Sequence, residues 1–168
     1  MFTNRVRQAI AATLQGLPLS ATVDSFTPPK IEFEMEAMTG GRFIAEEMAK
    51  SGKPLTATLA LQGVGPEIML ALGVRLGDDI LLNVREAGQD QDGKTYFTYH
   101  TVGGKLKSLA ETALSMNVKP TTTLELSCRT YSRLENGIPV IDIDVRTQKF
   151  VLNGVDILGD ARRAVLMP

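Results

Sequence analysis

The sequence is short of the residues on which most catalytic and metal centres depend. It has one cysteine and one histidine among 168 residues, too few for zinc or iron sites of familiar spacing. Cys128 has no partner for an internal disulfide, and we expect it to be a small buried side chain. No apolar run approaches the roughly 20 residues of a membrane-spanning helix. Arg5 and Arg7 are not followed by a secretory signal, so we expect a soluble product that is made or assembled inside a cell.

An excess of charge of either sign is also missing. The chain has 18 basic and 19 acidic residues, for a net charge of −1. There is no basic surplus to hold a nucleic acid statically, and no acidic tail. A chain of this length can bury most of its apolar surface without disulfides or metals, so we expect one domain over residues 1–168.

Motifs for catalysis are not found either. The sequence contains no Gly-x-Ser-x-Gly, no phosphate-binding loop and no dinucleotide fingerprint. His100 lies in a strand pattern with aromatic residues, which is typical of a hydrogen-bonded structural histidine. Asp90 and Asp92 resemble part of a calcium loop without its closing acid, and a polar turn explains them better. The sequence therefore predicts no catalytic residue, no metal and no cofactor, although a hydrolase that uses scattered carboxylates is kept as a rival.

What the sequence does have is a β-hairpin in its second half. Residues 121–131 and 140–146 alternate between apolar and polar side chains. Between them, Asn136 and Gly137 supply the two positions with φ > 0 that a type I′ turn needs. This turn predicts that Arg129 lies opposite Asp144, and that the sheet is buried on one face only. The same register pairs Cys128 with Val145 and Thr130 with Ile143, and its apolar face holds Leu124, Leu126, Cys128, Ile143 and Val145.

Further segments have the same two-residue period, and we expect strands at 30–38, 55–61, 80–86 and 94–102. A short hairpin over residues 9–23, turning at Gly16, is favoured over a helical stripe. Helices are predicted at 65–73 and 105–117, the second with Leu106, Leu109 and Leu114 on one face. The predicted fold is mainly β, with two antiparallel sheets that form a β-barrel or sandwich and a flanking α-helix.

Residues 39–54 form the longest stretch without a strand pattern, and we expect a long loop with at most one helical turn near residues 43–49. Such a loop is uncommon in a compact β domain and is often functional. It exposes Phe43, Ile44 and Met48 unless the domain itself or a neighbouring subunit covers them. Together with uncovered strand edges, this predicts self-association into a ring or an open fibre.

The order of these signals resembles the major tail tube proteins of contractile-tailed bacteriophages. The likeness runs from Leu14-Gln15-Gly16 through residues 23–31 and 38–41 to Gly63-Val64-Gly65-Pro66. It is most specific at the end of the chain, where Asn136-Gly137 and Ile141-Asp142 are followed by Asn153-Gly154-Val155-Asp156 and by Arg162-Arg163. Residues 105–117 depart from the family pattern, because they have more helical character than we expect there.

The resemblance implies a structural subunit and not an enzyme. Such subunits form hexameric rings, similar to type VI rings, that stack into a hollow tube inside a contractile sheath and conduct DNA to the host without binding it specifically. The implied partners are copies of the chain, the tail sheath, tape-measure, baseplate and tail terminator proteins, in a virion assembled in the bacterial cytoplasm. A tube of a phage-tail-like bacteriocin or type VI-like system is the alternative, and a monomeric ligand-binding β-barrel a remote one.

Two groups of residues are candidates for roles in such an assembly. The 39–54 segment resembles the extension that bridges one ring to the next. A face of carboxylates could repel phosphate along the lumen, although an outward or inter-subunit position is equally natural. The candidates for ring stacking or subunit contact are Gly40, Gly41, Arg42, Phe43, Ile44, Met48 and Lys53, and those for the lumen are Glu32, Glu34 and Glu36.

Overall fold

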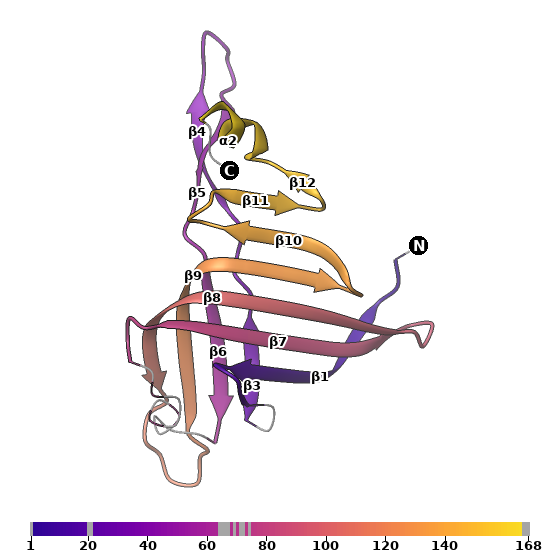
Figure 1. Cartoon of the computed structure of the whole chain (residues 1–168), viewed down its shortest axis with the longest axis vertical. Coiled ribbons are helices and arrows are strands. Elements are labelled where there is room, and N and C mark those ends of the chain that lie inside the picture. Colours follow the sequence, from indigo (N-terminus) through magenta and orange to yellow (C-terminus); the bar gives the residue numbers. More distant parts are fainter. Residues whose placement is uncertain are drawn as a thin grey trace.

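A computed structural model describes residues 2–19, 22–63, 68, 70, 73 and 75–165. Almost all regular structure in this part of the chain is antiparallel β (Figure 1). The main sheet has the strand order β12-β11-β10-β9-β8-β7-β1-β2, and a separate two-stranded sheet pairs β4 with β5. The strands are β1 Arg5–Leu14, β2 Leu17–Pro18, β3 Val23–Thr27, β4 Phe33–Met38, β5 Glu46–Gly52, β6 Thr56–Gln62, β7 Asp79–Asp90, β8 Thr95–Glu111, β9 Thr121–Glu135, β10 Ile138–Asp144, β11 Lys149–Leu152 and β12 Val155–Asp156.

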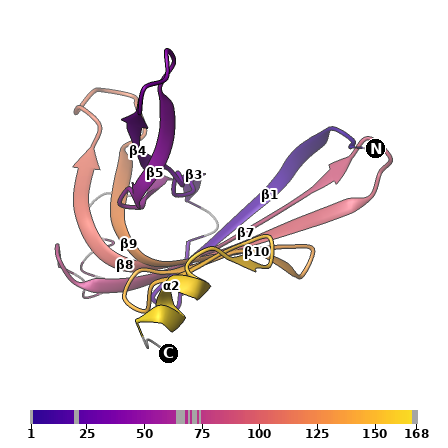
Figure 2. The same cartoon turned by 90° about the horizontal axis from the view of Figure 1, so that it is seen from above.

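The long strands β8 and β9 bend, so that one sheet wraps around the core (Figure 2). The same edge of β9 pairs with β6 over residues 121–127 and with β10 over residues 130–135. Arg129 lies between these halves as an extra residue, because Gly103 pairs with Thr130 while Gly104 pairs with Cys128. A bulge of this kind increases local twist and bending. The sheet does not close on itself within the described residues, so the expected barrel is not observed, whereas the mainly β, antiparallel architecture is confirmed.

The core lies inside this bend, where buried apolar side chains from six strands meet. The strands alternate between buried and exposed positions, as one-sided burial requires. β6, for example, buries Ala57, Leu59 and Leu61 completely. Burial of these side chains is the main stabilising contribution that this sheet offers. The largest fully buried residues are Leu14, Leu59, Leu61, Leu82, Val102, Leu106, Leu124, Leu126 and Tyr131.

The predicted turn at Asn136-Gly137 is confirmed, but the predicted register is wrong by one residue. Both turn residues have positive φ, 51° and 80°. The pairing then shifts between Pro139 and Ile141, so Thr130 and not Arg129 lies opposite Asp144. Proline has no N–H to donate to the ladder, and a bulge next to it is the usual solution.

The shift changes which side chains of this hairpin reach the core. Ile143 and Cys128 are buried as predicted, whereas Val145 is 56% exposed and does not reach the core. Ile143 pairs with Tyr131. Tyr131 is buried, although the predicted alternation would place it on the exposed face. The buried positions of β9 are therefore even-numbered before the Arg129 bulge, and the buried position after it, Tyr131, is odd-numbered.

The helix predicted at residues 105–117 is wrong, because residues 105–111 are the end of β8 and pair with β9. A register shift between Leu106 and Ser108 makes Lys107 an extra residue. Leu106 and Leu109 therefore lie on the same face of a strand although they are three positions apart, a spacing that otherwise indicates a helix. Leu114, assigned to the same helical face, is fully exposed.

Other expectations have mixed outcomes. The N-terminal hairpin is confirmed, since β1 and β2 pair across Gln15 and Gly16. The strands expected at 80–86 and 94–102 are confirmed and are longer than predicted. The helix expected at 65–73 falls mostly outside the described residues. The 39–54 segment is not a loop with a helical turn, because Glu46–Gly52 form β5 and pair with β4.

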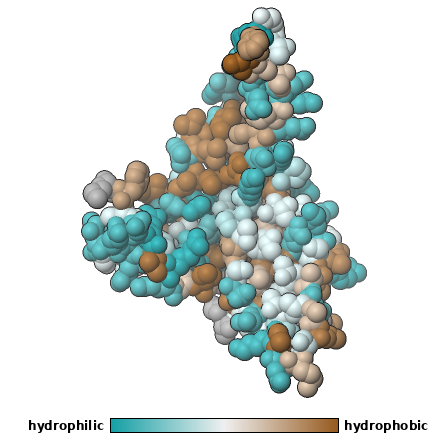
Figure 3. Space-filling model, turned by 180° about the vertical axis from the view of Figure 1, so that it is seen from behind, coloured by the Kyte–Doolittle hydropathy of each residue, from teal (hydrophilic) through white to brown (hydrophobic). Residues whose placement is uncertain are grey.

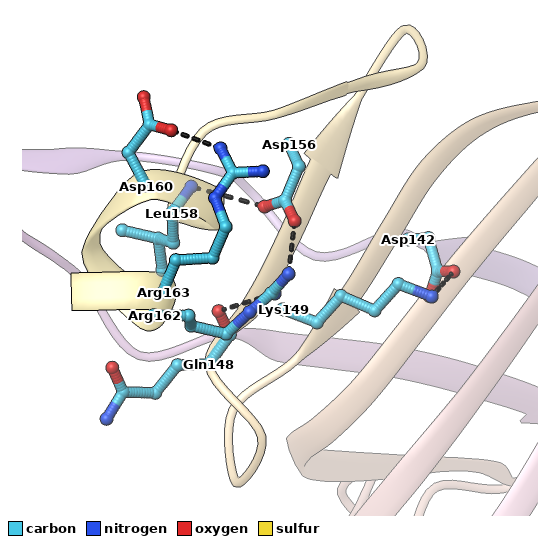
Figure 4. Close-up of polar contacts among 8 residues, drawn as sticks. All are labelled: Asp142, Gln148, Lys149, Asp156, Leu158, Asp160, Arg162 and Arg163. Atoms are coloured by element: carbon cyan, nitrogen blue, oxygen red, sulfur yellow. Dashed lines mark hydrogen bonds and ion pairs between the residues drawn. The ribbon is translucent and has the colours of Figure 1, made fainter. Parts of the chain in front are cut away.

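A small cap covers the C-terminal end of the sheet (Figure 4). It consists of β12 and the helix α2, Gly159–Ala164. The Arg162 guanidinium forms an ion pair with Asp156 and also donates a hydrogen bond of 3.3 Å to the Gln148 carbonyl. Asp156 also accepts a hydrogen bond from the Leu158 backbone N–H at 3.2 Å. These contacts fix the short helix to the last hairpin of the sheet. In the described residues no helix is long and apolar enough to cross a membrane.

Candidate interaction surfaces

The β4–β5 hairpin projects away from the rest of the chain, and we call it the projecting hairpin (Figures 1 and 2). Every residue of both strands is exposed. A two-stranded hairpin alone in water is at best marginally stable. The base is held by backbone and aromatic contacts, since Lys53 N–H donates to Glu32 C=O at 2.9 Å and the Phe33 ring lies 5.7 Å from that of Phe150. The outer part of the hairpin is therefore available to cover, or be covered by, another surface.

The two faces of the projecting hairpin differ in chemistry. Cross-strand pairs share a face, so the pairs of Met35 with Ala49 and of Ala37 with Glu47 place mostly apolar groups on one side. The other face carries three carboxylates, Glu34, Glu36 and Glu46, beside Met38 and Met48. The separation of apolar from acidic side chains predicted for residues 31–37 is thus confirmed, but neither side is buried.

The predicted contact residues occupy the turn and the flanks of this hairpin. Gly40 and Gly41 have φ of 48° and 80° and let the chain reverse. Phe43 next to them is fully exposed and Ile44 is 78% exposed. Figure 3 shows apolar surface at this tip and a second apolar patch beside the base of the hairpin. An apolar tip of this kind is a common mark of a protein–protein contact. Arg42 is ion-paired with Glu46, and Met48 is exposed on β5.

Lys53 and Glu32 lie apart from the tip, at the base of the hairpin. The carboxylate of Glu32 is 3.4 Å from the ammonium groups of both Lys30 and Lys53. Hydrogen bonding and attraction to Lys30, followed by those to Lys53, lower the pKa of Glu32. The three carboxylates proposed for one role are therefore not equivalent, because Glu32 is already matched by two cations while Glu34 and Glu36 are not.

A groove of about 700 Å³ separates the base of the projecting hairpin from the C-terminal cap. Sequence reasoning did not find it, because its walls come from segments far apart along the chain. Its lining is mainly apolar and includes Ile31, Phe33, Cys128, Val145, Phe150 and Ile157. Burial raises the pKa of the Cys128 thiol to about 11, so the cysteine is a neutral, poorly nucleophilic group at neutral pH.

A second cavity, of about 590 Å³, lies on the inner face of the arm formed by the outer ends of β1, β7 and β8. We call it the arginine cavity, and it is lined by Arg5, Val6, Arg7, Glu86, Tyr96, Thr98, Arg133 and Glu135. Its residues come from four strands, so no local sequence motif predicts it. Arg7 is 2.5 Å from Glu86, and Arg133 is 2.8 Å from Glu135. The Arg5 guanidinium carbon lies 4.7 Å from the centre of the Tyr96 ring, a cation–π contact.

None of these surfaces has the arrangement of a catalytic centre. No cluster of three or more potential metal ligands occurs among the described residues. The histidine ring is buried beside Tyr131, and burial, assisted by the Arg133 charge, lowers the pKa of His100 to about 4. What the described part of the chain presents instead is two projecting arms with exposed apolar and charged side chains.

Comparison with known proteins identifies the family. Residues 7–165 match the family described as phage tail tube protein FII, and the chain belongs to this family of structural, non-enzymatic tail proteins. A comparison with curated proteins finds no match. Among solved structures, the chain is similar to one in the cryo-EM structure of the anti-feeding prophage baseplate, 6-fold symmetrised, with 14% identity and a TM-score of 0.47 over 80% of this chain and 97% of that one.

Proposed function

We propose that this chain is the subunit of the inner tube of a contractile tail. In this proposal, copies of the chain form six-membered rings, and the rings stack into a hollow tube that conducts DNA into a host cell. The observation that carries the proposal is the projecting hairpin, both of whose faces are exposed in the single chain. Membership of the tail tube family supplies the context in which copies of the chain would cover it.

The edges of the main sheet support the same conclusion. β2, β3 and β12 each end a path of paired strands in the described part of the chain. Unpaired edges invite pairing with other chains, and a ring of identical subunits would cover them. A head-to-tail contact that closes gives a ring, while one that does not close gives an open stack. A tube needs both kinds of contact.

The charge of the chain suits a conduit for DNA. Each phosphate that a protein neutralises adds affinity and would slow passage. The net charge of −1 offers no general attraction to a polyanion. We propose that the tube conducts DNA without binding it specifically, inside a sheath and together with tape-measure, baseplate and terminator proteins. A bacteriocin or type VI-like tube would use the same subunit design with a different cargo. A monomeric ligand-binding barrel is less well supported, because the sheet does not close in the part of the chain described.

The carboxylates of Glu32, Glu34 and Glu36 have two possible places in such a tube, the lumen and the contact between copies. Glu32 is already paired with two lysines at the hairpin base, whereas Glu34 and Glu36 lie farther out on an arm that stands away from the core. This difference favours a contact between copies for the outer pair. Replacing all three by glutamine separates the two placements: intact tubes with altered DNA ejection support the lumen, and loss of tubes supports the contact.

Electron microscopy of the purified protein tests the proposed function directly. We expect rings or tubes as the protein concentration rises, and light scattering should show masses well above the 18.2 kDa of one chain. A protein that stays monomeric at millimolar concentration, with the projecting hairpin resistant to protease, would overturn the proposal. Co-purification of the tubes with the tail sheath protein would extend it to the contractile tail.

A further inference from the structure

The arginine cavity lies where the inner face of the sheet is no longer covered. Along β1, this inner face carries Leu14, Ala12 and Ile10 in the core and then Arg7 and Arg5 farther out. Along β9, it carries Tyr131 and then Arg133. The side of the sheet that is apolar in the core thus becomes charged at its outer end, where three arginines lie beside two glutamates. Charged side chains on this face are matched best by polar groups of opposite charge and not by apolar ones.

The cations of this cavity are incompletely partnered. The carboxylates of Glu86 and Glu135 are held by Arg7 and Arg133, respectively. Arg5 makes no ion pair with any residue that the structure describes, and its guanidinium is stacked only on Tyr96. The Nε atom of Arg133 is buried and has no hydrogen-bond partner within the described chain. A buried donor without an acceptor costs free energy comparable to a lost hydrogen bond. The exposed guanidinium of Arg5 is the donor that a neighbouring group could reach, and a carboxylate is its best match.

The acidic face of the projecting hairpin has the matching chemistry and spacing. Glu34 and Glu36 are two residues apart on β4, and Arg5 and Arg7 are two residues apart on β1. In both strands this separation is about 7 Å, and the two side chains point to one side. Glu46 lies on the same face of the hairpin as the β4 pair. Glu46 is already ion-paired with Arg42, so the match rests on Glu34 and Glu36 along β4 facing Arg5 and Arg7 along β1.

The hairpin that supplies these carboxylates must belong to another copy of the chain. Figure 2 shows the projecting hairpin and the arm of β1 and β7 pointing in different directions, so a chain does not fold its own hairpin onto its own cavity. We propose that the arginine cavity of one copy receives the acidic face of the projecting hairpin of the next copy. This inference rests on the proposed function, and names the charged contact that joins neighbouring subunits of the assembly. The contact is head-to-tail, because it joins two different surfaces.

Charge reversal on each side provides the test. Arg5→Glu changes an exposed side chain of the cavity, and Glu36→Lys changes an exposed side chain of the hairpin. We expect each variant alone to raise the protein concentration needed for assembly by about tenfold or more, because like charges then meet in the contact. An equimolar mixture should assemble nearly as well as the wild-type chain. In an alternating assembly every contact joins either two wild-type surfaces or two reversed surfaces.

Matched controls come from the opposite faces of the same elements. Arg85 stacks on Tyr99 at 4.9 Å, which repeats the Arg5–Tyr96 geometry on the outer face of the sheet. Glu47 lies on the apolar face of the projecting hairpin, opposite the face of Glu36. Arg85→Glu and Glu47→Lys should leave the concentration for assembly within about threefold of wild type, since neither changes the proposed contact. Thermal unfolding of all four dilute variants checks that they fold.

The outcomes distinguish the contact from the function on which it rests. If wild-type protein never assembles, both the proposed tube and this contact are overturned. If wild type assembles and the single reversals assemble equally well, or the mixture is not rescued, the contact is overturned while the tube stands. Oxidation of mixed Arg5→Cys and Glu36→Cys copies gives an independent reading. We expect disulfides between the two kinds of copy, and mainly reduced chains would argue against the contact.

Discussion

The imidazole of His100 lies 3.0 Å from the hydroxyl of Tyr131, where β8 and β9 pair inside the bend of the sheet. The two rings are stacked with centroids 6.1 Å apart, and Phe26 packs on the histidine at 5.5 Å. Burial raises the pKa of Tyr131 to about 12 and, with Arg133 nearby, lowers that of His100 to about 4. Both side chains are therefore neutral at pH 7, and the only histidine of the chain is a structural residue.

This environment predicts that the fold loses stability below neutral pH. The unfolded histidine takes up a proton near pH 6.5, while the folded one does so only near pH 4. Between these values the unfolded state binds more protons, so the free energy of unfolding falls as pH is lowered. We expect a loss of about 2 kcal/mol between pH 7 and pH 5, measured by urea unfolding of the dilute protein.

A His100→Gln variant supplies the control for this prediction. It removes the titrating ring and keeps a polar group near Tyr131, so its stability should be lower at pH 7 but nearly independent of pH between 7 and 5. Carboxylates titrate mainly below this window. If the free energy of unfolding falls equally with pH in wild type and variant, His100 is not the group responsible for the loss.

Gly104 is predicted to be irreplaceable for a different reason, which is the close approach of β9. A Cβ atom at this position would lie 2.1 Å from the Ser127 carbonyl oxygen and 2.9 Å from the Cys128 Cα. Both are backbone atoms within a paired strand, so they cannot move without disturbing the ladder. We expect Gly104→Ala to lower the free energy of unfolding by at least about 2 kcal/mol.

Gly52 is the matched control for Gly104. It also lies in a strand, but it is exposed and has no atom within 4 Å of the position that a Cβ would take. Gly52→Ala should change the free energy of unfolding by no more than about 0.5 kcal/mol. Similar losses at both glycines would mean that backbone freedom, and not the approach of β9, explains the effect.

Strands could be predicted from the sequence where apolar and polar side chains alternate, whether or not one face is buried. The alternation in residues 55–61 follows directly from burial of every second side chain in β6. β4 is exposed on both faces, yet a strand was expected at residues 30–38 because apolar and acidic residues alternate there. Residues 46–52 of β5 also have neither face buried. The residues of β5, Glu-Glu-Met-Ala-Lys-Ser-Gly, do not alternate between apolar and polar types, so their sequence suggested a loop.

Bulges explain the remaining errors. An extra residue at Lys107 gives Leu106 and Leu109 a helical spacing within a strand, and the shift next to Pro139 moves the hairpin register. The identity of an extra residue depends on the partner strand, which the local sequence does not contain. The arginine cavity was missed for a related reason, since its residues are close only after four strands have paired.

The C-terminal cap supplies a prediction about two neighbouring carboxylates. Asp156 pairs with Arg162, whose side chain is mostly buried, and it also accepts from the Leu158 N–H (Figure 4). Asp160 pairs with Arg163 in an exposed contact. Asp156→Asn should weaken the cap by about 1–2 kcal/mol. Trypsin cleavage after Arg162 should then accelerate by about tenfold.

Asp160→Asn tests whether any lost ion pair would have the same result. Exposed pairs of this kind contribute little to stability, so we expect the cleavage rate to stay within about twofold of wild type. If both variants are cleaved equally fast, α2 is held mainly by its backbone and apolar contacts, and the Asp156–Arg162 pair is not what fixes the cap.

The tip of the projecting hairpin should matter for assembly and not for folding. Phe43 and Ile44 lie in the turn and make no contact that burial would reveal, since both are largely or fully exposed. Replacing both by serine should leave the unfolding temperature of the dilute chain unchanged. If copies of the chain cover this tip, the same variant should need at least about tenfold more protein to form rings or tubes, because burying two large apolar side chains contributes several kcal/mol.

A conservative variant distinguishes a specific contact from general stickiness. Phe43→Leu with Ile44→Val keeps the tip apolar and should assemble within about threefold of the wild-type concentration. If the double serine variant assembles at the wild-type concentration, the tip is not part of the contact. The carboxylates of β4 then remain as the part of the hairpin that joins the copies. Loss of thermal stability in that variant would instead show that the tip packs within its own chain, which its exposure argues against.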